Sequence, residues 1–84
     1  MSDDEIKALI LRELAKIAPE AGSEIEPNVD LREQIDLDSM DVLDLMIAIH
    51  EATAVDIPEA DYPQLATLNA AVAYLRKRIK AAPG

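Results

Sequence analysis

A single hydroxyl group, flanked by carboxylates, stands where a polar segment gives way to a long run with helical apolar spacing. The segment reads Asp36-Leu37-Asp38-Ser39-Met40-Asp41. A serine at the start of a helix is exposed, and the backbone N–H groups that lack partners there favour an attached phosphate. The pattern therefore makes Ser39 a candidate for covalent modification. The alternative is that Asp38 or Ser39 only caps the helix, as such pairs commonly do.

The chain lacks the residue groups that catalysis or metal binding would need. Its 84 residues include one histidine and no cysteine. His50 lies eleven residues after Ser39, which in a helix is about 16 Å along the axis, too far to act as its base. We therefore expect His50 to be a surface residue. We predict no catalytic residues, no metal site and no enzymatic activity.

The charge of the chain disfavours one class of partner and favours another. Seventeen acidic residues against eight basic ones give a formal net charge of −9. Such a surface repels nucleic acid and attracts proteins that carry patches of Lys and Arg. The N-terminal residues lack the order of a signal peptide, and no apolar run is long enough to span a membrane. We expect a cytoplasmic monomer that binds basic protein surfaces and does not insert into membranes.

Apolar residues recur at three- and four-residue spacing in three stretches, which predicts three long helices. The first follows a capping-box pattern of Ser2 and Glu5, and the last follows Thr67, an N-cap residue type. Prolines leave room for one short helical piece between the second and third. The helical segments are expected at residues 3–17, 39–53, 59–65 and after Thr67, where Leu68, Val72, Leu75 and Ile79 form one stripe.

The stretch from Ala18 to Leu37 is rich in Pro, Gly, Asp and Glu, and it is predicted to form one long ordered loop. A chain of this length makes a single small domain, residues 1–84. The expected fold is therefore all-α: a small antiparallel bundle of three long helices plus one short helix.

The apolar residues of the 39–53 segment fall on two arcs when the segment is drawn as a helix. The broader arc, suited to a core, consists of Val42, Leu45, Met46 and Ile49. The second arc, bordered by Asp44 and Glu51, consists of Met40, Leu43 and Ile47. Either both arcs are buried in the bundle, or the second is an exposed strip that docks a partner.

The region around Ser39 resembles the acyl carrier proteins at their phosphopantetheine attachment site. The resemblance is carried by Asn28-Val29-Asp30-Leu31-Arg32-Glu33-Gln34-Ile35-Asp36-Leu37-Asp38-Ser39-Met40-Asp41, by the apolar helix and by Val55-Asp56-Ile57-Pro58, and it covers nearly the whole chain. It implies that Ser39 receives 4′-phosphopantetheine from coenzyme A through a phosphopantetheinyl transferase. The thiol of this arm would carry acyl groups as thioesters to acyl-transferring or condensing enzymes of fatty-acid, lipid or polyketide synthesis. A peptidyl or aminoacyl carrier and an unmodified carrier-like scaffold or regulatory module are the alternatives.

The same resemblance assigns roles to further residues. Asp38 helps present the serine to the transferase, and Met40 is the hydrophobic residue that follows it. Partner enzymes with basic docking patches are expected to bind Asp36, Asp41, Leu43, Asp44, Ile47 and Glu51. Acyl chains are expected to slip between the helices into a pocket lined by Leu45, Met46, Ile49, Ile57, Leu65 and Val72. The alternative for this last set is an ordinary aliphatic core.

The sequence departs from the family pattern at three positions. Asp36 stands where the family usually has Gly, and Gln34 stands where an aspartate is often found. His50 occupies a place where another acid is common. These departures predict a specialised carrier whose partners differ from the generic fatty-acid synthase enzymes.

Overall fold

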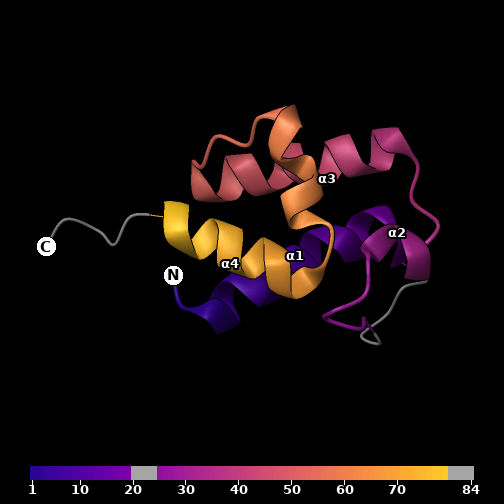
Figure 1. Ribbon diagram of the computed structural model, residues 1–84, viewed down its shortest axis with the longest axis horizontal. Coiled ribbons are helices and arrows are strands. Elements are labelled where there is room, and N and C mark those ends of the chain that lie inside the picture. The colour runs from indigo at the N-terminus through magenta and orange to yellow at the C-terminus, as the bar shows by residue number, and fades with distance from the viewer. Residues whose placement is uncertain (20–24, 80–84) are drawn as a thin grey trace, which may run out of the picture.

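The computed structural model describes residues 1–19 and 25–79, and within these ranges the fold is all-helical (Figure 1). The elements are α1 (Asp3–Ile17), α2 (Leu31–Gln34), α3 (Ser39–Thr53), the 3₁₀ helix η2 (Glu59–Leu65) and α4 (Leu68–Arg78). Figure 1 shows α3 and α4 running in the direction opposite to α1. Helix α1 contacts both of them, and η2 contacts α4. The predicted bundle of three long helices is confirmed.

The two helix starts predicted from cap residues are present. The Glu5 N–H donates to Ser2 Oγ over 3.2 Å, and the Ser2 N–H donates to Glu5 Oε1 over 2.8 Å. The hydrogen bond from the Ser2 N–H, and to a lesser extent the Ser2 hydroxyl, lowers the pKa of Glu5. Thr67 Oγ1 accepts a 3.0 Å hydrogen bond from the Ala70 N–H. These side chains satisfy N–H groups that a helix leaves without partners in its first turn.

The prediction of an unbroken loop between α1 and α3 is wrong at α2. The Asp30 side chain caps this turn by accepting from the Arg32 N–H over 2.8 Å, and Leu31 is buried. The Leu31 N–H also donates to the Ala66 carbonyl over 2.8 Å, which attaches the turn to the segment after η2. Four residues are too few to show a helical period, so sequence pattern could not reveal this turn. Residues 20–24 of the predicted loop lie outside the described residues.

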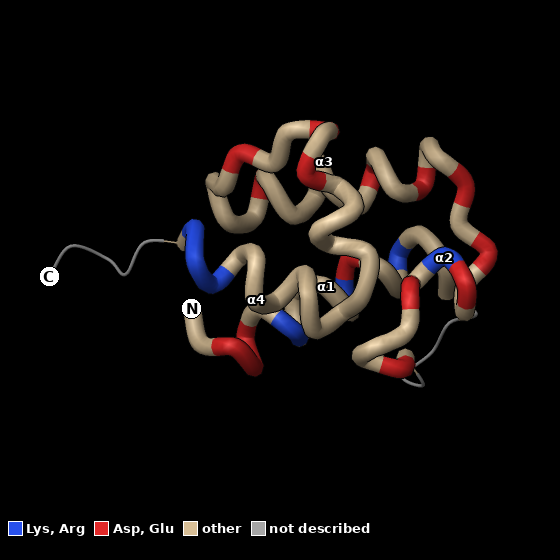
Figure 2. The backbone as a smooth tube through the Cα atoms, in the orientation of Figure 1, with Lys and Arg blue, Asp and Glu red and all other residues tan. Residues whose placement is uncertain are grey.

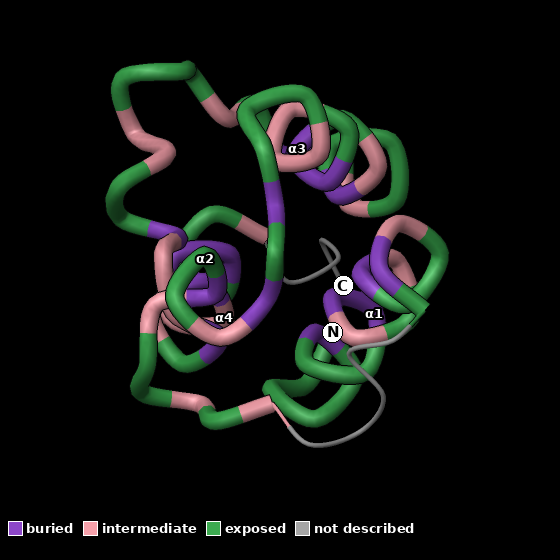
Figure 3. The backbone as a smooth tube through the Cα atoms, turned by 90° about the vertical axis from the view of Figure 1, so that its right-hand side faces the viewer, coloured by how far each residue is buried: buried purple, intermediate pink, exposed green. Residues whose placement is uncertain are grey.

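The segment between α2 and α3 fixes where α3 begins. Ile35 and Leu37 are each 6% exposed, whereas Asp36 and Asp38 are exposed. Figure 3 shows this alternation along the segment, with the two buried positions on either side of an exposed one. Alternate side chains of an extended chain point to opposite sides. The apolar residues therefore anchor the backbone while the carboxylates stay in water.

The core beneath the site is almost entirely aliphatic. No polar or charged side chain is buried in the described ranges, and Tyr74 is the one aromatic residue among the buried ones. The largest fully buried side chains are Ile6, Ile10, Leu14, Ile49, Leu65, Leu68 and Leu75. Each long helix contributes to this cluster, so burial of its apolar stripe holds the bundle together.

Candidate functional site

The first turn of α3 is closed by two aspartates that cap each other. The Asp41 N–H donates to Asp38 Oδ1 over 2.8 Å, and the Asp38 N–H donates to Asp41 Oδ2 over 3.2 Å. Asp38 is therefore the N-cap residue, and Ser39 is the first residue of the helix. The sequence left open which of the two residues caps. The structure assigns the cap to Asp38, which frees the serine.

The Ser39 hydroxyl is available for chemistry. Ser39 is exposed, and its Oγ forms no hydrogen bond among the described residues. Within the described residues, the backbone N–H groups of Ser39 and Met40 also donate no hydrogen bond, as expected in a first helical turn. An oxygen in this position meets the positive end of the helix dipole. A phosphate attached to it would face N–H donors on one side and water on the other.

Carboxylates surround the hydroxyl. Asp36 and Asp38 are exposed and Asp41 is half-buried, so three acidic side chains lie within three positions of Ser39 in the chain. Figure 2 shows Asp and Glu along the segment before α3 and along α3, while Lys and Arg gather at the end of α4. The segment before α3 and α3 itself therefore present mainly negative charge, which attracts cationic protein surfaces.

A strip of exposed apolar residues runs along α3 beside these acids. Met40 is 62% exposed and Ile47 is 45% exposed, while Leu43 is half-buried. Asp44 and Glu51, which border the strip, are exposed. The opposite arc is the buried one: Leu45, Met46 and Ile49 lie in the core, and Val42 is half-buried against it. Of the two readings of the second arc, the structure favours the exposed strip.

A cavity of about 640 Å³ opens between α2, α3 and η2, and Ser39 is one of its lining residues. Its walls include Ser39, Leu45 and Met46 of α3, Leu31 of α2, and Tyr62 and Leu65 of η2. The cavity thus connects the exposed hydroxyl with apolar side chains of the core. A group attached to Ser39 would therefore start at the edge of this cavity.

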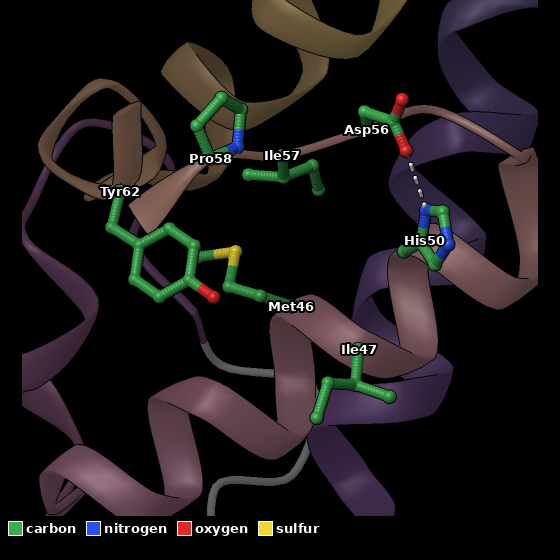
Figure 4. Close-up of a pocket in the computed structure, with 7 residues that line it drawn as sticks. All are labelled: Met46, Ile47, His50, Asp56, Ile57, Pro58 and Tyr62. Carbon is green, nitrogen blue, oxygen red and sulfur yellow. Dashed lines mark ion pairs between the residues drawn. The ribbon is translucent and has the colours of Figure 1, made fainter. Parts of the chain in front are cut away.

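A second cavity, of about 370 Å³, is also lined by Met46 and Tyr62 (Figure 4). Figure 4 shows these two side chains pointing toward one another from α3 and η2, and both of them line both cavities. His50 stands at the rim, with Nδ1 2.8 Å from the Val55 carbonyl and 3.8 Å from Asp56 Oδ1. Because a carbonyl oxygen only accepts, Nδ1 carries a proton. His50 thus lies at the surface, as the sequence predicts.

The residues predicted for an acyl pocket do not all lie together. Leu45, Met46 and Leu65 line the larger cavity, and Ile57 lines the smaller one. Ile49 is fully buried in the core, Val72 packs against the core, and neither lines these two cavities. Sequence reasoning did not single out Tyr62 as a wall of both cavities. An aromatic residue between two prolines carries no signal of such a position.

A hydrogen bond fixes the wall that η2 provides. The Tyr74 hydroxyl donates to Asp61 Oδ2 over 2.7 Å, and the Gln64 amide reaches the other carboxylate oxygen over 3.3 Å. Burial, reinforced by the bond to Asp61, raises the pKa of Tyr74 above its ordinary value of 10.0. The neutral phenol therefore persists at physiological pH and holds η2 against α4.

No group of three or more His, Cys, Asp or Glu side chains is placed to hold a metal ion in the described part of the chain. Within the same ranges, no helix combines the length and apolar character needed to cross a membrane.

A family model described as the phosphopantetheine attachment site matches residues 6–75. The chain belongs to this family, that of the acyl carrier proteins. Members of the family are carriers and not enzymes, and 4′-phosphopantetheine is their cofactor. The match confirms the sequence predictions of the family, of a carrier and of the cofactor.

Curated relatives agree with this assignment at low identity. The chain is 28% identical over 72 residues to an acyl carrier protein of Helicobacter hepaticus, covering 86% of this chain and 90% of the relative. It is 29% identical over 76 residues to an acyl carrier protein of Chlamydia caviae, covering 90% of this chain and 94% of the relative. A similar protein of Rubrobacter xylanophilus is 32% identical over 53 residues, or 63% of this chain and 65% of the relative.

The residues around Ser39 fit the family's cofactor. An arm joined through a phosphate needs an accessible hydroxyl, N–H donors for the phosphate oxygens and space for a chain of atoms. Ser39 supplies the exposed hydroxyl, the first turn of the 15-residue helix α3 supplies the donors, and the adjoining cavity supplies the space. When bound, the arm supplies the thiol that this chain, which has no cysteine, lacks.

Proposed function

We propose that this protein carries acyl groups as thioesters on a 4′-phosphopantetheine arm attached to Ser39. The observation that carries the proposal is the mutual cap of Asp38 and Asp41, which leaves the neighbouring Ser39 hydroxyl exposed and without a described partner. In the attachment step, Ser39 Oγ would form a bond to the pantetheine-side phosphorus of coenzyme A while the P–O bond of the pyrophosphate to the adenosine side breaks. Adenosine 3′,5′-bisphosphate leaves, and the serine proton passes to a base on the transferase.

Intact-mass spectrometry after incubation with coenzyme A and a phosphopantetheinyl transferase tests this attachment. The wild type should gain the mass of one arm, and Ser39→Ala should gain none. Ser2→Ala is the matched control, because Ser2 is also an exposed serine at a helix start, and this variant should still gain the arm. Since the chain has no cysteine, a thiol reagent should report none before the reaction and one after it. An unmodified wild type would favour a scaffold or regulatory module instead.

The proposed docking surface for partner enzymes is the exposed strip of α3 with its acidic border. The expected partners are the phosphopantetheinyl transferase and biosynthetic enzymes for fatty acids, lipids or polyketides whose docking faces carry Lys and Arg. Met40, Leu43 and Ile47 would provide apolar contact area, and Asp36, Asp41, Asp44 and Glu51 would provide charge complementarity. Complementary charges speed and orient association more than they add affinity, so docking should weaken with salt.

The larger cavity is the proposed resting place of the acyl chain. Support comes from its position, since Ser39 lies on the same cavity as Leu45, Met46 and Leu65. Loading the arm with an octanoyl group instead of an acetyl group should shift the methyl resonances of these three residues. Methyl groups of Ile6 and Ile10, which are buried in α1, serve as the control and should move little. Equal shifts at both sets, or none at either, would contradict the assignment.

A further inference from the structure

Arg32 is the one cation that shares a cavity with Ser39 in the described part of the chain. No other Lys or Arg lines that cavity. The Arg32 Nε–H donates to the Leu37 carbonyl over 3.3 Å, which draws the side chain of α2 toward the segment that leads into α3. Leu37 is two residues before Ser39, so the guanidinium is held near the start of α3.

The guanidinium of Arg32 has N–H donors left to bind an anion. Arg32 is exposed and takes part in none of the ion pairs among the described residues. The neighbouring Asp30 uses its carboxylate on the Arg32 backbone N–H, as a helix cap, and not on the guanidinium. With Nε occupied by Leu37, the two terminal amino groups of the guanidinium keep their N–H donors for another acceptor.

A phosphodiester on Ser39 would need such a partner. It adds a negative charge beside Asp36, Asp38 and Asp41, and like charges at short range are unfavourable. The N–H groups of the first turn of α3 offset part of this repulsion. A guanidinium on the cavity side would offset more, because its planar set of donors matches two phosphate oxygens at once.

We propose that Arg32 binds the phosphate of the prosthetic arm and thereby lays the first part of the arm along the cavity between α2, α3 and η2. This inference rests on the proposed attachment at Ser39. Arg32 is a positioning residue: it touches neither the thiol nor the thioester. It shifts the arm from an extended position in solvent toward a position against the protein, and a partner that draws the arm out must break this contact.

The anion could instead be a carboxylate at the far end of a dicarboxylic cargo. Two observations favour the phosphate over a cargo carboxylate as the anion that Arg32 binds. Arg32 is tethered to Leu37, next to the attachment segment, and the phosphate is joined directly to Ser39 Oγ. A phosphate is also present on every arm whatever it carries, whereas a cargo carboxylate is not.

Phosphorus-31 NMR of the protein carrying the arm tests the contact. In the wild type the ³¹P resonance should be shifted from that of free phosphopantetheine and should relax with the whole protein. In Arg32→Gln the shift should move toward the free value and the line should narrow. Arg32→Lys should retain part of the shift, because Lys keeps the charge but loses the paired donors. Arg76→Gln, which removes a cation that contacts Asp3 at 3.6 Å outside this cavity, should leave the signal unchanged.

A second measurement uses the wild type alone and does not depend on a variant. The Nε–H resonance of Arg32 should shift when the arm is attached, and added salt should reverse part of that shift. Unchanged ³¹P relaxation in Arg32→Gln together with an unmoved Arg32 Nε–H signal would overturn the proposal. The proposal would also be overturned if the Arg32 Nε–H resonance shifted when the arm carries a succinyl group but not when it carries an acetyl group. If intact mass shows no arm on Ser39, the proposed function itself fails, and this is known before any spectrum is recorded.

Discussion

The hydroxyl of Tyr74 donates a 2.7 Å hydrogen bond to the carboxylate of Asp61 and so joins α4 to η2. Tyr74 is 4% exposed, and the Arg78 guanidinium lies 3.5 Å from the centre of its ring. The pair connects the inner core to the wall of both cavities, because η2 also carries Tyr62. This hydrogen bond requires the protonated form of the Tyr74 hydroxyl, so the position of η2 depends on the protonation state of Tyr74.

Tyr74 should make the stability of the protein depend on pH in the alkaline range. Its pKa is raised in the folded state, so its contribution is fully present below the unfolded pKa of about 10 and is lost as pH rises through the folded pKa. Urea unfolding at increasing pH above about 9 should show this loss in the wild type and not in Tyr74→Phe. Tyr62→Phe is the control and should follow the wild type. Parallel loss in wild type and Tyr74→Phe would contradict the assignment.

Removing the cap of α3 should destabilise the protein, whereas removing the serine beside it should not. Asp38→Ala should lower the free energy of unfolding by about 1 kcal/mol, because the Asp41 N–H loses its acceptor. Asp38→Asn keeps an acceptor oxygen and should cost much less. Ser39→Ala should stay within about 0.5 kcal/mol of the wild type in urea unfolding. A larger effect at Ser39 than at Asp38 would mean that the serine is the cap.

Ala54 ends α3 in a conformation that suits glycine. Its φ is 59° and its ψ is 19°, and its N–H donates to the His50 carbonyl over 2.8 Å. A side chain disfavours this left-handed region, so Ala54→Gly should raise the free energy of unfolding by about 0.5–1 kcal/mol despite the entropy that glycine adds to the unfolded chain. Thermal unfolding measures this, with Ala52→Gly inside the same helix as a control that should destabilise. A lower Tm for Ala54→Gly would contradict the prediction.

Ile47 should matter for partners more than for the fold. It is 45% exposed, so Ile47→Ser should cost at most about 1 kcal/mol of stability while it removes apolar area from the docking strip. The KM for the phosphopantetheinyl transferase should rise. Val29→Ser is the matched control, since Val29 is 39% exposed but lies outside α3, and it should leave the KM unchanged. Equal effects of the two substitutions would show that the strip is not a docking surface.

Much of the fold followed from residues that act locally. The caps at Ser2 and Thr67 and the apolar spacing of the long helices depend on neighbours within one or two turns, so a sequence pattern reports them directly. The turn at α2 escaped prediction because its tie is a hydrogen bond from Leu31 to Ala66, which is distant in sequence. The cavity wall that Met46 and Tyr62 share could not be predicted either, because these two residues are also distant in sequence.

The sequence by itself determined the family, the carrier role and the serine to suspect, because the motif around Ser39 is contiguous and its meaning does not depend on distant residues. Only the tertiary structure decided that Asp38 is the cap, that Met40 and Ile47 face water, and that Arg32 and Ser39 border one cavity. Exposure and proximity depend on how separate helices pack, and helical periodicity specifies which face is apolar without specifying what covers it.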